Sequence, residues 1–254
     1  MTYTHALLTR PSAESRELAR LLVPLGLRAI VQPAFDYLPV NAAIEQPEVW
    51  KALESATAAD LVVFTSPRAV AHGLAQLPPG CNTRAAFAAV GPATTRALEE
   101  SGVKVGVHSP GGYTSEALLE TVDAKASGRD SAARRAFILA APGGRDALEQ
   151  GLRARGWMVY KYLVYRSEPA ELDREQLARL ADADGLLAVW TSGNAMNSLA
   201  QRLSPSTWRR ICSGDWLVIS ERLRKLARSF RPQRIHLASG PGNDAILASI
   251  RDLL

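Results

Sequence analysis

The sequence has little of what redox and metal sites are usually built from. Its 254 residues include two cysteines and four histidines. Cys81 and Cys212 are too few for a disulfide framework and form no C-x-x-C pair, so we expect two free thiols. The histidines show no metal-ligand spacing, and no Ser-His-Asp or G-x-S-x-G arrangement is visible. These absences argue against a metal site and against conventional nucleophilic catalysis.

Targeting and nucleotide motifs are also missing. No apolar run approaches the roughly 18 residues of a membrane span, and MTYTHALLTR lacks the features of a signal peptide, so we expect a cytoplasmic location and no membrane contact. There is no G-x-x-x-x-G-K-[ST] loop. Gly240-x-Gly242-x-x-Ala245 resembles a dinucleotide fingerprint, but no strand with an acidic residue about 20 positions later accompanies it. We therefore expect no nicotinamide cofactor.

The composition indicates a globular protein with an anionic partner. Hydrophobic residues make up 47% and charged residues 22%, with a net charge of +5. A basic excess suits nucleic acid or a small polycarboxylate or phosphate. The basic residues are spread along the chain without a long basic arm or interleaved aromatics, so we expect a small molecule and no nucleic acid.

Strand and helix patterns alternate along the whole chain, which predicts α/β units with parallel sheets. Gly26, Gly102 and Gly156 each follow a helical pattern and suit a left-handed cap. The expected strands lie near 5–10, 28–32, 60–65, 85–90, 103–107, 136–140, 157–163, 185–190, 216–219 and 234–238.

The chain also contains an internal duplication. VVFTSPRAV (62–70) is echoed by AVWTSGNAM (188–196), and LLTRPSAESRELARLLVPLG (7–26) by ILAAPGGRDALEQGLRARG (138–156). Segments 88–102 and 110–120 find counterparts at 216–230 and 239–249. The nearly constant offset predicts two copies of a unit of about 127 residues.

Two extended, proline-bounded segments occupy equivalent places in the two copies, at 32–40 and 160–169. They suit two crossings between lobes, laid side by side as a two-stranded hinge. Lobe one would then contain 1–36 and 168–254, and lobe two would contain 37–167.

Polar residues and glycines gather where strands end and helices begin. In parallel sheets these ends face the ligand, and free backbone N–H groups there attract carboxylates or phosphates. For Ser66 and Ser192 a simple helix cap is the competing interpretation. The candidate ligand-binding residues are Thr9, Arg10, Thr65, Ser66, Gly91, Pro92, Gly143, Gly144, Arg145, Thr191, Ser192, Gly193 and Ser220.

The motifs, in order and over essentially the whole chain, resemble the uroporphyrinogen-III synthase family. They are LLTRP (7–11), VVFTSPRAV (62–70), AAVGPATTRAL (88–98), GGRDALEQGLRARGWMVYKYLVYR (143–166) and VWTSGNAM (189–196). The resemblance implies two flavodoxin-like α/β lobes joined by a two-stranded hinge, lobe one being discontinuous. It also implies a lyase that dehydrates hydroxymethylbilane and closes it to uroporphyrinogen III with ring D inverted, in haem biosynthesis, without cofactor or metal.

The resemblance further implies roles for single residues. Tyr165 lies where the family has a tyrosine that assists loss of the ring A hydroxyl, although a purely structural hinge aromatic is the alternative. Ser66 and Ser192 would bind carboxylates of the linear tetrapyrrole. Ser220-Glu221-Arg222 replaces a Gly-Pro-Thr-Thr type of turn, so only carboxylate binding by Ser220 carries over. A monomer and a transient contact with the upstream hydroxymethylbilane synthase are expected.

A second hypothesis is a noncatalytic two-lobed binding or sensor protein for an anionic small molecule. Turnover of hydroxymethylbilane to the type III isomer distinguishes the two.

Overall fold

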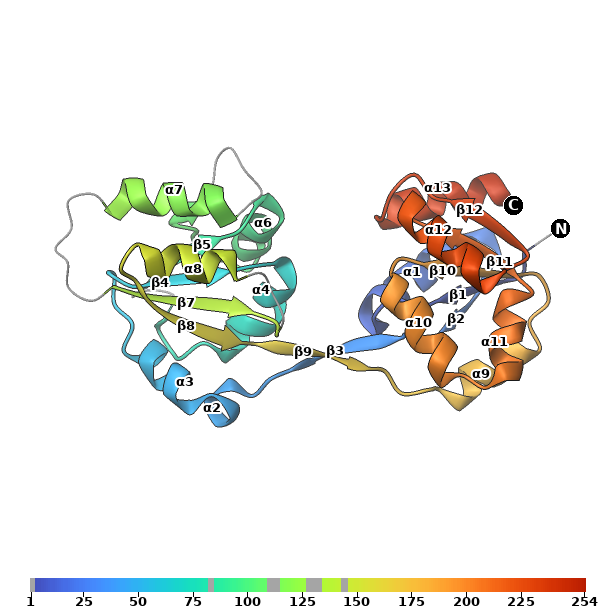
Figure 1. Ribbon diagram of the computed structural model, residues 1–254, viewed down its shortest axis with the longest axis horizontal. Helices are drawn as coiled ribbons and strands as arrows, with labels where there is room; N and C mark the ends of the chain where they lie inside the picture. The colour runs from blue at the N-terminus through green and yellow to red at the C-terminus, as the bar shows by residue number, and fades with distance from the viewer. Residues whose placement is uncertain (1–2, 82–84, 109–114, 127–133, 143–145) are drawn as a thin grey trace. The chain divides into compact units, whose positions relative to one another are not determined.

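A computed structural model of the chain describes residues 3–81, 85–108, 115–126, 134–142 and 146–254. The chain forms two compact units: unit 1 comprises Met1–Tyr37 and Glu168–Leu254, and unit 2 comprises Leu38–Ser167. The chain passes between the units along strands β3 (Phe35–Pro39) and β9 (Tyr165–Pro169), which pair as a two-stranded sheet (Figure 1).

Unit 1 is built on a five-stranded parallel sheet with the order β12-β11-β10-β1-β2. Counted along the chain, this is the order 2-1-3-4-5 of flavodoxin-like folds. The strands are β1 (His5–Leu8), β2 (Arg28–Val31), β10 (Leu186–Trp190), β11 (Asp215–Val218) and β12 (Arg234–Leu237).

Helices cover both faces of this sheet because successive strand residues point to opposite sides. Leu7 packs into the cluster that includes helices α9 to α12, whereas Ala6 and Leu8 pack into the cluster with α1 and α13. Trp190 and Trp216 pack against each other in the first cluster, with ring centroids 4.9 Å apart and ring planes inclined by 44°. The helices are α1 (Ser12–Leu22, extended by the 3₁₀ turn η1, Val23–Leu25), α9 (Arg174–Ala181), α10 (Gly193–Arg202), α11 (Pro205–Cys212), α12 (Glu221–Phe230) and α13 (Asn243–Leu253).

Unit 2 repeats the design. Its five-stranded parallel sheet has the order β6-β5-β4-β7-β8, so that β4, β5 and β6 take the places of β10, β11 and β12, and β7 and β8 those of β1 and β2. The duplication read from the sequence is therefore visible as a common strand order. The strands are β4 (Leu61–Phe64), β5 (Ala86–Ala89), β6 (Val107–His108), β7 (Arg135–Ala140) and β8 (Met158–Leu163).

Helices α7 and α8 lie together on one side of the unit 2 sheet (Figure 1), where they form a core with Val63 and Ile138. On the other side α4 contacts β4 and β7, α3 contacts β8, and α6 contacts α4. The helices are α2 (Ala42–Glu45), α3 (Pro47–Glu54), α4 (Pro67–Gly73, followed by the 3₁₀ turn η2, Leu74–Gln76), α6 (Pro92–Glu100), α7 (Ser115–Ala126) and α8 (Ala147–Ala154).

The predicted α/β class with parallel sheets is confirmed. Nine of the ten predicted strands lie where expected, whereas the strand expected over 103–107 is the short β6, Val107–His108. Gly26, Gly102 and Gly156 have φ values of 74°, 76° and 79°, as the predicted left-handed caps require. The extended segment expected over 160–169 is divided: its first residues belong to β8, and β9 begins at Tyr165. Among the described residues, no helix combines the length and apolar character needed to cross a membrane.

Candidate functional site

In unit 1 the predicted residues gather at the carboxyl edge of the sheet. Thr9 follows β1 and Ser192 follows β10, on the two strands between which the chain order reverses, and Ser220 follows β11. Ligands of open α/β sheets bind at such a switch point. The Thr9 side chain is buried, and its hydroxyl donates to the Val189 carbonyl at 2.9 Å. The hydroxyl hydrogen of Thr9 is therefore used in a hydrogen bond that links β1 to β10.

The serines at this edge are helix caps. Ser192 Oγ accepts from the Ala195 N–H at 3.4 Å, and Ser220 Oγ accepts from the Leu223 N–H at 3.3 Å. Both side chains are half-buried. A cap uses the hydroxyl oxygen as an acceptor and makes no use of its hydrogen, which a carboxylate can still receive. Capping and ligand binding are therefore compatible at these positions.

Three other predicted residues of unit 1, Arg10, Gly193 and Thr191, lie near the same edge and differ in their contacts. Arg10 forms an ion pair with Glu14 at 2.9 Å and donates to Asn243 Oδ1 at 2.8 Å, so its charge is partly balanced. A Cβ on Gly193 would lie 2.7 Å from Leu226 Cδ2, so this glycine allows α10 and α12 to approach closely. Thr191 is half-buried at the end of β10.

The equivalent edge of unit 2 shows the same contacts. The Thr65 hydroxyl donates to the Leu139 carbonyl at 2.9 Å, which joins β4 to β7 at this sheet's switch point. Ser66 Oγ accepts from the Ala69 N–H at 3.1 Å and caps α4. Gly91 precedes α6 with φ 81°, and Pro92 opens that helix. The predicted Gly143, Gly144 and Arg145 lie outside the described residues.

Tyr165 stands beside α4 in the same unit. It is the first residue of β9 and is 7% exposed. The imidazole of His72 lies against it, with ring centroids 5.3 Å apart and ring planes inclined by 32°. The Arg68 guanidinium carbon lies 6.0 Å from the centre of the Tyr165 ring. Unit 2 thus brings the Tyr165 phenol close to an imidazole and a guanidinium, both of which belong to α4, the helix that Ser66 caps.

His72 and Arg68 were missed in the sequence, although a signal was present. They are four positions apart, which places both on one face of a helix. Burial, followed by repulsion from the Arg68 charge, lowers the pKa of His72 below its usual value. A neutral imidazole therefore faces Tyr165 at neutral pH.

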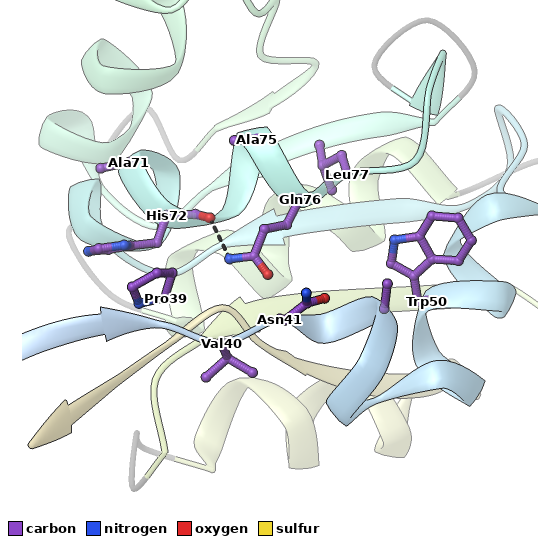
Figure 2. Close-up of a pocket in the computed structure, with 10 residues that line it drawn as sticks. Pro39, Val40, Asn41, Trp50, Ala71, His72, Ala75, Gln76 and Leu77 are labelled. Carbon is purple, nitrogen blue, oxygen red and sulfur yellow. Dashed lines mark hydrogen bonds between the residues drawn. The ribbon is translucent and has the colours of Figure 1, made fainter.

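A pocket of about 600 Å³ adjoins this site within unit 2. Figure 2 shows Gln76 and Trp50 on opposite sides of it, with Asn41 and Val40 below them and His72 farther along. Among the described residues there is no group of three or more His, Cys, Asp or Glu side chains that could hold a metal ion.

Two α/β units with matching parallel sheets, and polar residues at the strand ends of each, place the chain in the class of duplicated, two-unit α/β proteins. Comparison with known proteins identifies the family. The family model described as uroporphyrinogen-III synthase HemD matches residues 16–248, and the chain belongs to this family.

The curated relatives extend over nearly the whole chain. The uroporphyrinogen-III synthase of Salmonella typhimurium is 32% identical over 259 residues, covering 96% of this chain and 99% of that protein. The protein of the same name from Escherichia coli is 31% identical over 252 residues, with the same coverage. Both names are those of an enzyme of the lyase class, which supports the first of the two hypotheses.

Solved structures show the same fold. Uroporphyrinogen-III synthetase from Helicobacter pylori superposes with a TM-score of 0.56 at 12% identity, covering 100% of both chains. A mutant uroporphyrinogen III synthase from Thermus thermophilus gives 0.53 at 18% identity, covering 99% of both chains. At these identities the likeness concerns the fold alone.

Proposed function

We propose that the chain converts hydroxymethylbilane to uroporphyrinogen III, inverting ring D as the macrocycle closes. The observation that carries this function is the family match, which runs through both units from residue 16 to residue 248. The strand-end serines and the Tyr165 site support it, because the substrate is a polycarboxylate that must lose a hydroxyl group.

The first chemical step is departure of the ring A hydroxyl. The lone pair of the ring A nitrogen expels it, and the leaving oxygen takes a proton to become water. Hydroxide is a poor leaving group, so a donor hydrogen bond at that oxygen lowers the barrier. Tyr165 is our candidate for this donor, since its phenol combines a buried ring with an O–H group.

Ring closure then depends on positioning. The electrophilic carbon left on ring A is attacked by the substituted α-carbon of ring D, which gives the spirocyclic pyrrolenine. The bond between this ring D carbon and the methylene bridge to ring C then breaks. The bridge carbon, now electrophilic, bonds to the free α-carbon of ring D, and loss of the proton from that carbon completes the inversion. These steps require the chain to hold a flexible substrate in one conformation, a task for hydrogen bonds to its carboxylates.

Ser66, Ser192 and Ser220 are the proposed carboxylate-binding hydroxyls. Each caps a helix through its oxygen, so its hydrogen can be donated to an anion. The Arg68 guanidinium adds positive charge beside Tyr165 in unit 2. We also propose that the enzyme acts as a cytoplasmic monomer that meets hydroxymethylbilane synthase transiently, since its substrate is reactive.

The test is a coupled assay in which hydroxymethylbilane is generated in place and the oxidised porphyrin isomers are separated. Conversion to the type III isomer is the expected result, because unassisted cyclisation gives the other isomer. Binding of hydroxymethylbilane with only the unassisted isomer formed would overturn the proposal in favour of a noncatalytic binding protein.

A further inference from the structure

One glutamine ties α4 to the backbone immediately before Tyr165. Strand β8 ends at Leu163 and β9 begins at Tyr165, so Val164 alone separates them. The Gln76 side-chain nitrogen donates to the His72 carbonyl at 2.7 Å, the bond drawn in Figure 2, and to the Val164 carbonyl at 3.0 Å.

These two bonds use both hydrogens of the Gln76 amide. One acceptor belongs to the residue whose ring lies on Tyr165, and the other to the residue that precedes Tyr165. The carbonyl of Gln76 in turn accepts from the Tyr162 hydroxyl at 3.1 Å, so a β8 side chain anchors the same turn. Gln76 is thus bonded to the backbone of His72 and to the backbone of Val164, the residue before Tyr165.

The close packing of α4 reinforces this link. A Cβ on Gly73 would lie 2.8 Å from Leu139 Cδ2 and 3.4 Å from Val164 Cγ1, so the end of α4 sits directly on the strands. Tight packing allows little relaxation of neighbouring side chains. The orientation of the Tyr165 ring is therefore set by α4 and η2 as well as by its own strand.

We propose that Gln76 is a positioning residue, which holds the His72 ring against Tyr165 and so aims the Tyr165 hydroxyl. This inference rests on the proposed function, in which Tyr165 assists departure of the ring A hydroxyl. Gln76 makes no contact with substrate in this proposal and acts through the two residues it joins.

Gln76→Met tests the proposal because methionine keeps the length of the side chain and removes its donors. Gln32→Met in unit 1 is the matched control. The Gln32 amide also donates to two carbonyls, those of Pro33 at 3.1 Å and Glu171 at 3.0 Å, and its side chain is 1% exposed. Both variants lose an amide that bridges two carbonyls, but only one amide belongs to the Tyr165 site.

We expect Gln76→Met to lower kcat by about ten- to a hundredfold, the scale of a misplaced catalytic group, while KM stays within about twofold. The NMR signal of the His72 imidazole, assigned by its absence in His72→Ala, will move because the Tyr165 ring no longer shields it. Gln32→Met is expected to change neither kcat nor the NMR signal of His72. Unchanged kcat and an unmoved signal for Gln76→Met would overturn the proposal.

A moved signal with unchanged kcat would also overturn it, and Tyr165→Phe in the same assay then shows what has failed. Normal turnover of Tyr165→Phe means that the role proposed for Tyr165 is wrong. Impaired turnover of Tyr165→Phe means that only the inference about Gln76 is wrong.

A second pair of variants keeps the test open if Gln76→Met does not fold. His72→Ala removes the ring but leaves the carbonyl that Gln76 binds, and His72→Phe restores a ring of similar shape. We expect the kcat of His72→Ala to fall by about tenfold and that of His72→Phe to recover most of the loss. Equal kcat for His72→Ala and the unchanged protein would contradict the proposal.

Discussion

The guanidinium of Arg135 closes on the carboxylate of Asp60 at the amino edge of the unit 2 sheet, with Nη2 lying 2.6 Å from Oδ2. Asp60 precedes β4, and Arg135 opens the adjacent β7. Unit 1 has a comparable pair in Asp215 of β11 and Arg234 of β12, 3.0 Å apart. Each sheet is therefore held by a buried carboxylate at one edge and carries its candidate ligand-binding residues at the other.

Asp60→Asn should destabilise the protein by about 2–3 kcal/mol, since it leaves the Arg135 charge without its carboxylate. Asp60 is 3% exposed and also accepts from the Thr57 N–H at 2.8 Å. Asp146→Asn is the control, because the Asp146 side chain is 60% exposed where it meets Lys161 and should contribute about 0–1 kcal/mol. Urea unfolding followed by circular dichroism measures both, and equal losses would contradict the argument.

The same carboxylates predict loss of stability in acid. Burial raises the pKa of Asp60 and of Asp215, but hydrogen bonds from Arg135 and Thr57 to the first, and from Tyr3 and Arg234 to the second, leave both pKa values below the usual range. A lowered folded-state pKa contributes stability that is complete above about pH 4 and is lost as the pH falls through the folded value.

The free energy of unfolding should therefore fall steeply below about pH 4. Asp60→Asn, which has one such carboxylate fewer, should show a shallower slope in the same range. Urea titrations at a series of pH values measure the slopes, and parallel curves for the two proteins would show that Asp60 is not involved.

Tyr165→Phe should lower the rate of the dehydration step by about 10²–10⁴-fold, the usual contribution of general acid assistance. The substitution keeps the ring, so the contact with His72 and the fold should persist. Single-turnover kinetics with isomer analysis measures the effect. A smaller loss is expected if the intrinsic reactivity of the substrate carries part of the rate, but the share of type III product should still drop.

Full turnover of Tyr165→Phe to the type III isomer, with Tyr165→Ala merely less stable, would make this tyrosine structural. Ring closure would then depend on positioning and backbone dipoles alone.

Ser66→Ala and Ser192→Ala should each weaken substrate binding by about 1–2 kcal/mol, through loss of a hydrogen bond to a carboxylate. Each should also lose about 1 kcal/mol of stability as a helix cap. Ser204→Ala isolates the cap, because Ser204 Oγ accepts from the Thr207 N–H at 3.2 Å at the start of α11, a helix that does not follow a strand.

KM and the urea midpoint of the three serine variants separate the two effects. We expect a raised KM for the variants at Ser66 and Ser192 and an unchanged KM for the variant at Ser204. The same stability loss in all three with normal KM would reduce Ser66 and Ser192 to helix caps.

Local patterns were sufficient for much of the fold. Buried strands such as 61–64 and 186–190 are continuous apolar runs that end at Thr-Ser, and Gly26, Gly102 and Gly156 mark left-handed caps that few other residues tolerate. The duplication followed from residue order alone, because each copy must bury the same faces of its sheet and therefore keeps the same pattern.

What each polar group does was decided by tertiary structure. The sequence predicts Thr9 and Thr65 as ligand-binding residues, and only the structure shows that both hydroxyls donate to the carbonyl of a neighbouring strand that is distant in sequence. The sequence predicts Gly193 as a ligand-binding residue, and only the structure shows that its missing Cβ leaves space for Leu226. Such partners come together only when strands and helices pack, so no local pattern contains them.

The surroundings of Tyr165 show the same division most clearly. The sequence by itself determined that a tyrosine follows β8 and that Arg68 and His72 share a helix face. Only the tertiary structure decided that this face lies on Tyr165 and that Gln76 bonds the carbonyl of Val164, 88 positions away in the chain. Long-range contacts of this kind are selected by the packing of the whole unit, because a hydrogen bond forms only where the fold brings donor and acceptor within reach.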